Sequence, residues 1–146
     1  EDIGLADPRA LQMAIEAWQA HDRLGSPEGD LALAQLTLYL ASTAKSNAGY
    51  VAWKRARADV EAHGTQPVPM HIRNAPTGLM KSLGYGKDYQ YDHDLEGGVA
   101  LDQTGFPDAI GEQVYYEPTT RGMEAKLKDK LDALRDARQQ ARKARR

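Results

Sequence analysis

The chain has 146 residues, of which 41% are hydrophobic and 27% are charged, and it contains no cysteine. These fractions are ordinary for one soluble globular domain with a core, and the lack of cysteine excludes disulfide bonds, thiolate metal sites and a cysteine nucleophile. No apolar run approaches the ~20 residues of a membrane-spanning helix, and no signal peptide is visible. The chain opens with "EDIGLADP" and no methionine, so we expect a fragment of a longer protein.

The net charge of −2 is unevenly distributed along the chain. Residues 121–146 carry ten Lys or Arg and four Asp or Glu, whereas residues 1–120 carry nine and seventeen. A basic end on an acidic body is typical of an interaction segment.

The first helix is expected within residues 7–25. Asp7 can cap it, Pro8 suits its first position and Gly25 can end it. Its large apolar residues recur at helical spacing and should share one face; they are Leu11, Ile15 and Trp18.

The second helix, expected within residues 26–46, has almost no polar face. Alanines separate its leucines, which are Leu31, Leu33, Leu36, Leu38 and Leu40. A helix that is apolar on nearly every side belongs to a core or to an interface. We therefore take these five leucines, with Trp18 and Trp53, as candidates for the core or for an oligomer interface.

The third helix is expected from Ser46, as its cap, to Gly64, as its stop. Residues 65–91 follow as a proline-bounded connector, in which Thr77 can cap a short helix. Its apolar residues are expected to anchor it onto the helices; they are Met70, Ile72, Leu79, Met80 and Leu83.

Residues 92–113 indicate a loop with a helical turn after Pro107, and "VYYEP" at 114–118 could pair briefly as a strand. Thr119 or Thr120 is then expected to cap the last helix, which has an apolar stripe ending at Leu134. Residues 135–146 offer nothing to bury, so we expect that basic tail to be frayed or disordered. The fold class is therefore all-α, a compact helical domain with irregular Pro/Gly-rich connections.

Three stretches could carry chemistry, but none is convincing. "GYGKD" at 84–88 lacks the glycine spacing of a phosphate loop and places Asp88 where phosphate would be repelled, so a helix stop and turn is favoured. The tyrosines at 85–91 could stack bases, but the acidic surroundings oppose nucleic acid and favour packing over the helices. "YDHD" at 91–94 has no second ligand pair to complete a metal site. We assign no catalytic, cofactor-binding or metal residues.

Several motifs, in order and at suitable spacing, resemble the C-terminal region of replication-associated recombination protein A. This family of AAA+ ATPases is also called MgsA, and its eukaryotic relative is Werner helicase interacting protein. The resemblance covers residues 1–134 and rests on "EDIGLADPRAL", "GSPEGDLALAQLTLYLASTAKSNAGYVAW", "PVPMHIRNAPTGLMKSLGYGKDYQYDHD" and "YYEPTTRGMEAKLKDKL".

The resemblance implies a helical domain, comparable to the collar of clamp loaders, that assembles a DNA-dependent ATPase into a homotetramer at replication forks. ATP and Mg would bind upstream of Glu1, so the fragment itself is expected to be non-catalytic, and residues 1–6 would join it to the ATPase lid. The implied partners are further copies of the chain, DNA, single-strand DNA-binding protein and other fork proteins, with no membrane. The implied location is the cytoplasm, in association with the nucleoid.

A second hypothesis uses the basic C-terminal segment as a DNA contact. Its cations could neutralise backbone phosphates without reading sequence. The alternative is a solvated helix end whose cations suit the helix dipole. The candidate DNA contacts are Arg138, Arg142, Lys143, Arg145 and Arg146.

Overall fold

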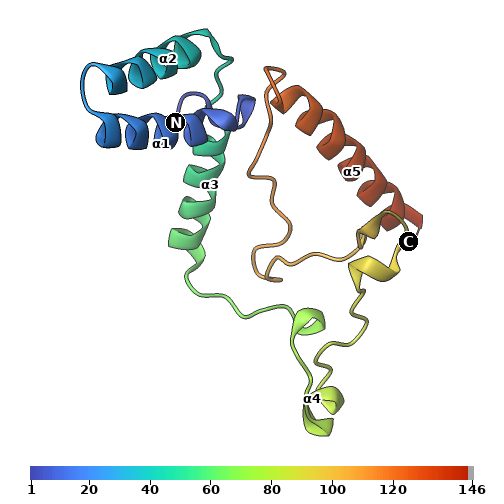
Figure 1. Cartoon of the computed structure of the whole chain (residues 1–146). Coiled ribbons are helices and arrows are strands. Elements are labelled where there is room, and N and C mark those ends of the chain that lie inside the picture. Colours follow the sequence, from blue (N-terminus) through green and yellow to red (C-terminus); the bar gives the residue numbers. More distant parts are fainter. Residues whose placement is uncertain (145–146) are drawn as a thin grey trace. The chain divides into compact units, whose positions relative to one another are not determined.

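The computed structural model describes residues 1–144, which contain five α-helices and no strand (Figure 1). This confirms the all-α fold class, whereas the brief strand predicted at 114–118 is wrong, because that stretch adopts no strand or helix. The helices are α1 (Arg9–Leu24), α2 (Glu28–Ser42), α3 (Ala48–His63), α4 (Gly78–Ser82) and α5 (Glu124–Ala144). The short 3-10 helices are η1 (Gly4–Ala6), η2 (Met70–Ile72), η3 (Asp92–Asp94) and η4 (Glu96–Gly98).

The chain divides into two units, whose boundaries fall inside α3, inside α5 and in the irregular stretch between Val114 and Tyr115. The first unit comprises Glu1–Ala56 and Tyr115–Lys130, and the second comprises Arg57–Val114 and the segment from Leu131 onward. The predicted division into a domain at 1–134 and a tail at 135–146 stays a prediction.

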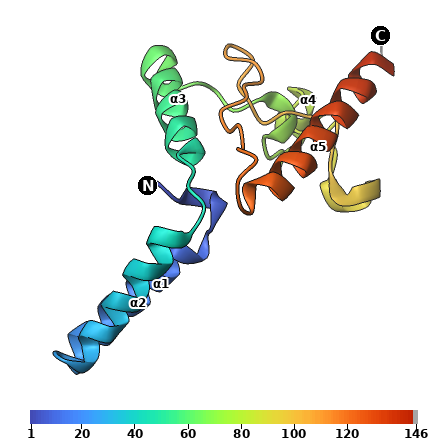
Figure 2. The same ribbon diagram turned by 90° about the horizontal axis from the view of Figure 1, so that it is seen from above.

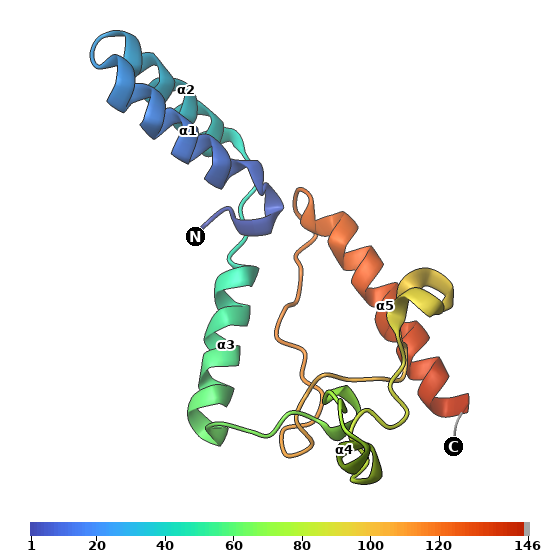
Figure 3. The ribbon, with the colours of Figure 1, turned by 60° about the horizontal axis from the view of Figure 1, so that its bottom comes forward.

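Helices α1 and α2 form an antiparallel hairpin in the first unit, side by side in Figures 1, 2 and 3. Asp7 caps α1 as expected, because its carboxylate accepts from the Arg9 N–H at 3.1 Å. The same carboxylate accepts hydrogen bonds from the Tyr39 hydroxyl and, at 3.0 Å, from the Thr43 hydroxyl. These bonds, that of Tyr39 first, hold the pKa of Asp7 below its usual value. Asp7 thus ties the start of α1 to the end of α2.

Glu124, the first residue of α5, is completely buried and gathers donors from two other segments. Its carboxylate accepts from the Tyr116 hydroxyl at 2.8 Å, from the Thr119 N–H at 2.9 Å and from the Thr119 hydroxyl at 2.7 Å. The Ser46 hydroxyl also donates to it while accepting from the Ala48 N–H at 3.2 Å, which confirms Ser46 as the cap of α3. Burial alone would raise the pKa of Glu124, but these hydrogen bonds together lower it.

The start of α5 differs from the prediction that Thr119 or Thr120 would cap it. The helix begins at Glu124, because the chain first makes a turn through Gly122, whose φ is +54°. A Cβ at Gly122 would overlap the Ala6 carbonyl oxygen, and that oxygen accepts from the Met123 N–H at 2.8 Å. A tertiary contact with the N-terminal segment therefore decides where the helix starts.

Polar contacts hold the connector in the second unit together. The Arg73 guanidinium donates to the Val68 carbonyl at 2.6 Å and lies 5.3 Å from the Tyr85 ring centroid. His71 contacts the Thr104 carbonyl at 2.9 Å, and Thr77 caps α4 as predicted. The predicted apolar anchoring is wrong in part, because three of the five residues stay exposed while Ile72 and Met80 are half-buried; the exposed ones are Met70, Leu79 and Leu83.

Helix α5 continues to Ala144, so the fraying predicted beyond Leu134 is wrong for the described part of the tail. The reason is an acidic partner that the sequence pattern does not reveal. The Arg138 guanidinium donates to Glu112 Oε1 at 3.0 Å, and the Arg142 guanidinium donates to Glu112 Oε2.

We expect Glu124→Gln to destabilise the chain by about 2–3 kcal/mol, because bonds from several donors to a charged acceptor are weakened at a buried site. The urea midpoint measures this effect. The matched control is Glu117→Gln, which removes one charge from an exposed pair with Arg55 and should change stability by less than about 1 kcal/mol. Equal midpoints for the two variants would contradict the assignment.

The lowered pKa of Glu124 also fixes the sign of a pH effect. The contribution of Glu124 to the free energy of unfolding should be fully present at any pH well above the ordinary pKa of 4.5, which includes pH 7. It should be lost as the pH falls through the lower pKa of the folded chain. Urea midpoints of wild type and Glu124→Gln, measured from pH 7 downward, should therefore converge in acid.

Candidate oligomerisation surface and basic segment

The predicted interface residues divide into two groups. Leu36 and Leu40 are half-buried in the hairpin. The other five are exposed, with fractions of 74% for Trp18, 72% for Leu31, 37% for Leu33, 73% for Leu38 and 64% for Trp53. A core role within the chain is therefore wrong for these five, and their role in an oligomer interface stays a prediction.

Small residues explain why the large ones point away from the hairpin seam. Ala10 and Ala17 of α1 and Gly29 of α2 are buried. A Cβ at Gly29 would lie 2.8 Å from the His21 Cα, so the two backbones touch at this point. Because the alanines and this glycine occupy the seam, the leucines and tryptophan of the other faces have no partner inside the hairpin.

Two outer stripes result, one on each helix. The α1 stripe consists of Leu11, Ile15 and Trp18, spaced at i, i+4 and i+7, and all three are at least half exposed. The α2 stripe consists of Leu31, Ala34, Leu38 and Ala41, spaced at i, i+3, i+7 and i+10, and all four are exposed. Such spacing is that of a seam against another helix.

The α1 stripe continues into a pocket of about 650 Å³ beside the N-terminal segment. Its walls are largely apolar and include Ile3, Leu5, Leu11 and Leu40, with Lys45 among the lining residues. The pocket therefore extends the apolar surface of α1, and Glu1, Asp2 and Lys45 are the charged residues among its lining.

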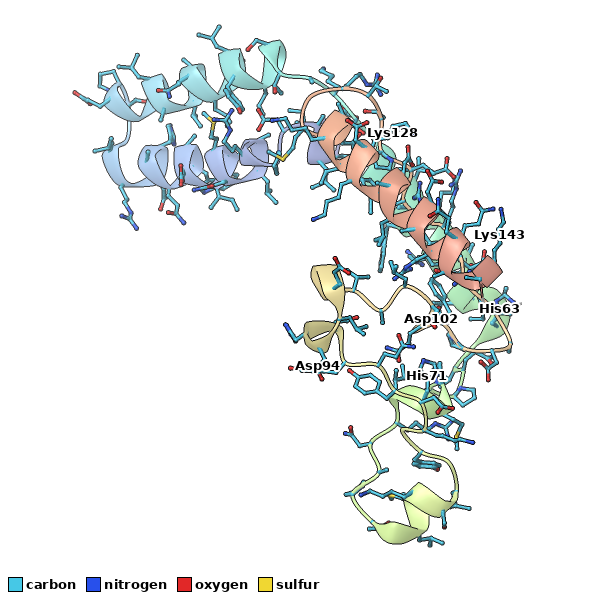
Figure 4. The ribbon with its side chains drawn as sticks, turned by 90° about the vertical axis from the view of Figure 1, so that its right-hand side faces the viewer. His63, His71, Asp94, Asp102, Lys128 and Lys143 are labelled. Carbon is cyan, nitrogen blue, oxygen red and sulfur yellow. The ribbon has the colours of Figure 1, made fainter. Side chains whose placement is uncertain are left out.

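The basic segment is only partly available for a ligand. Arg138 and Arg142 both bind Glu112, and their side chains are 31% and 46% exposed. Lys143 lies near the end of α5 in Figure 4. Arg145 and Arg146, the remaining candidate DNA contacts, lie outside the described residues. Sequence reasoning missed Glu112, because a lone acidic residue in an acidic loop carries no signal of its partners.

The stretches considered for chemistry have conformations that suit turns. Gly84, Gly86 and Asp88 have φ of +88°, +68° and +61°, so the chain turns after α4, which is the favoured interpretation of "GYGKD". Tyr89 and Tyr91 are about half exposed. The prediction that these tyrosines pack over the helices is therefore wrong for a tight packing.

Within residues 1–144 no three His, Cys, Asp or Glu side chains could hold a metal ion. The labelled Asp94 and His71 come from separate segments of the second unit (Figure 4). Among the same described residues, every helix is too short or too polar to cross a membrane.

Residues 1–135 match the family model described as "MgsA AAA+ ATPase C terminal". The chain is thus an all-helical domain from the C-terminal part of an AAA+ ATPase. More specifically, it belongs to the MgsA family.

Its curated relatives include two bacterial proteins named replication-associated recombination protein A. The chain is 51% identical over 140 residues to that of Coxiella burnetii, covering 96% of this chain and 32% of the relative. It is 50% identical over 131 residues to that of Escherichia coli K12, covering 90% and 29%. ATPase WRNIP1 of Dictyostelium discoideum is 44% identical over 117 residues, covering 80% and 13%. The chain therefore spans about a third or less of these relatives.

We expect Gly29→Ala to destabilise the hairpin by about 1–3 kcal/mol, because the added methyl group must push α1 away from α2. Gly49→Ala is the matched control. Gly49 also occupies the second position of a helix, but a Cβ there meets nothing within 4 Å, so this change should be neutral or stabilise by up to about 1 kcal/mol. Thermal unfolding followed by circular dichroism compares the stability of the two variants. If Gly29→Ala loses no more stability than Gly49→Ala, the close contact between α1 and α2 is refuted.

Proposed function

We propose that the chain is the homotetramerisation domain of a DNA-dependent AAA+ ATPase that acts in replication-fork maintenance, recombination and repair. The names of its relatives support the process, and the family description supports the ATPase. The observation that carries the oligomeric role is the exposure of the outer stripes on α1 and α2. Neither catalysis nor cofactor binding is assigned to this chain; ATP and Mg would act elsewhere in the longer protein.

The two stripes favour self-association for a physical reason. Each large apolar side chain that is buried contributes about 1.5–3 kcal/mol when it leaves water completely, so several such residues can hold an obligate interface. Obligate interfaces resemble a core cut in half. The described chain fits that comparison, because its buried apolar residues are all small, five alanines with Pro69 and Pro118.

The separation of the stripes supports four copies. A stripe on each helix allows two different two-fold contacts per copy, and two such contacts close a tetramer with dihedral symmetry. The collar of clamp loaders is a comparable helical assembly. The proposed setting is the cytoplasm, in association with the nucleoid, with single-strand DNA-binding protein and other fork proteins as further partners.

The mass of the chain in solution tests this proposal. Light scattering at micromolar concentration should give about four times the chain mass, and Leu31→Gln with Leu38→Gln should lower it, because both residues belong to the α2 stripe. Thr37→Gln is the control, since Thr37 is exposed but lies outside that stripe. A wild-type monomer, or an unchanged mass in the double variant, would count against the proposal.

A second candidate function is a DNA contact through the basic segment. The observation in its favour is that α5 remains helical to Ala144 and so holds Arg138, Arg142 and Lys143 at fixed spacing. If the chain forms a tetramer, four such segments would be linked, and linked weak sites gain affinity through their effective concentration.

Replacing all the candidate contacts by glutamine tests this second function while keeping good helix formers. The variant changes Arg138, Arg142, Lys143, Arg145 and Arg146. We expect gel-shift binding to single-stranded DNA at ~50 mM salt, where phosphate contacts are strong, and we expect the variant to lose it. Unchanged binding, with an unchanged mass in solution, would refute the contact.

A further inference from the structure

The guanidinium groups of Arg138 and Arg142 lie on one face of α5 and bind the same carboxylate; we call this pair the arginine grip. They are four residues apart, so their side chains emerge about one turn apart on the same side of the helix. The two guanidinium groups hold different oxygens of a single carboxylate, since Arg138 donates to Glu112 Oε1 and Arg142 to Glu112 Oε2. Guanidinium groups arranged in this way suit carboxylate and phosphate equally well.

The backbone around Glu112 presents this carboxylate from a structured turn. The Ile110 and Gly111 N–H groups donate to the Pro107 carbonyl at 3.0 Å and 2.9 Å. Gly111 then reverses the chain with a φ of +70°, and the Gln113 side chain donates to the Ile110 carbonyl at 3.0 Å. Glu112 therefore sits on a short local turn and needs no long-range contact besides the two arginines.

Glu112 does not accept hydrogen bonds from all the N–H groups of the two arginines. The Nε atom of Arg138 is buried and has no hydrogen-bond partner among the described residues. A carboxylate offers two oxygens, and both already face the arginines. A phosphate group offers more oxygens on a tetrahedral centre, so it can accept more of the N–H groups that the two arginines supply.

We propose that Arg138 and Arg142 form a binding site for a backbone phosphate of nucleic acid, and that Glu112 occupies this site in the free chain as a built-in competitor. The proposal rests on the DNA contact of the second candidate function and gives it a site and a control. The ligand is a polyanion rather than an isolated anion, because Lys143 follows directly on the helix and Arg145 and Arg146 follow in the sequence.

Competition by Glu112 has two measurable consequences. A phosphate must displace a carboxylate that is already paired, so the affinity of the wild-type chain is lower than its number of cations implies. The carboxylate that the phosphate displaces is left unpaired beside the nucleic acid and attracts a salt cation, so fewer counterions are released in total than with a chain without Glu112. The salt dependence of binding is therefore shallower in the wild type than in a chain without Glu112.

Fluorescence anisotropy of a labelled oligothymidylate, titrated with the 146-residue chain at ~50 mM salt, tests the proposal. Glu112→Gln should tighten binding about two- to fivefold, the range expected for a partly exposed ion pair. The slope of log affinity against log salt should become steeper by about 0.7, which corresponds to about one further counterion released on binding.

Glu117→Gln is the matched control for charge. It removes one negative charge from a residue that also pairs with an arginine, Arg55 at 2.9 Å. If both variants gain equally, the effect is net charge alone and the site is refuted. Adding Arg138→Gln and Arg142→Gln to Glu112→Gln should cancel the gain, and persistence of the gain would refute the grip. Circular dichroism checks that each variant keeps its helix content.

The outcomes separate this site from the broader function. If the wild type binds DNA but Glu112→Gln changes neither affinity nor slope, the basic segment contacts DNA and the competitor role is wrong. If neither protein binds, both ideas fail. A last outcome compares two unlabelled competitors on Glu112→Gln, an acidic peptide and oligothymidylate, at equal concentrations of negative charge. If the acidic peptide displaces the labelled oligothymidylate at the lower concentration, the grip prefers a carboxylate partner and the phosphate assignment is overturned.

Discussion

The buried carboxylate of Glu124 is the interaction on which the first unit depends. It is a charged group without contact to water, a state that costs several kcal/mol unless hydrogen bonds compensate it. The compensation comes from Ser46 at the start of α3 and from Tyr116 and Thr119 before α5. Burial, followed by the bond to Glu124, raises the pKa of Tyr116 to about 12, so that hydroxyl remains a donor at neutral pH. One carboxylate thus brings the starts of two helices together.

This polar junction matters because the described chain has little apolar core to replace it. Apart from Pro69 and Pro118, its buried apolar residues are alanines, namely Ala6, Ala10, Ala17, Ala48 and Ala100. Alanine buries little area, so close backbone contact and hydrogen bonds must carry the fold. Only glycine permits that contact at three places, which are Gly122 against Ala6, Gly29 against His21 and Gly4 against Ser46. The large apolar side chains, excluded from these narrow seams, are left on the outer surfaces.

Local signals were predictable from the sequence, whereas those that depend on distant segments were not. Asp7, Ser46 and Thr77 cap their helices as expected, because a cap needs only its own side chain and an N–H two or three residues on. The start of α5 could not be predicted, because a hydrogen bond to Ala6 fixes it. Leu31 and Leu38 were expected on a helix that is apolar on nearly every side, a pattern that could not tell a core face from an exposed one. Glu112 has no pattern that points to Arg138.

The exposed stripes and the arginine grip connect the two proposed functions, because assembly through the stripes would strengthen nucleic-acid binding by a grip that Glu112 occupies. A grip weakened by its own carboxylate contributes little as a single site, so one copy would bind a polyanion poorly at physiological salt. Linking copies through the stripes multiplies weak sites, and each engaged phosphate releases counterions. Binding would then depend steeply on assembly. A strong site on each copy would not need assembly in this way, so under the two proposals Glu112 would make nucleic-acid binding a property of the oligomer more than of the single chain.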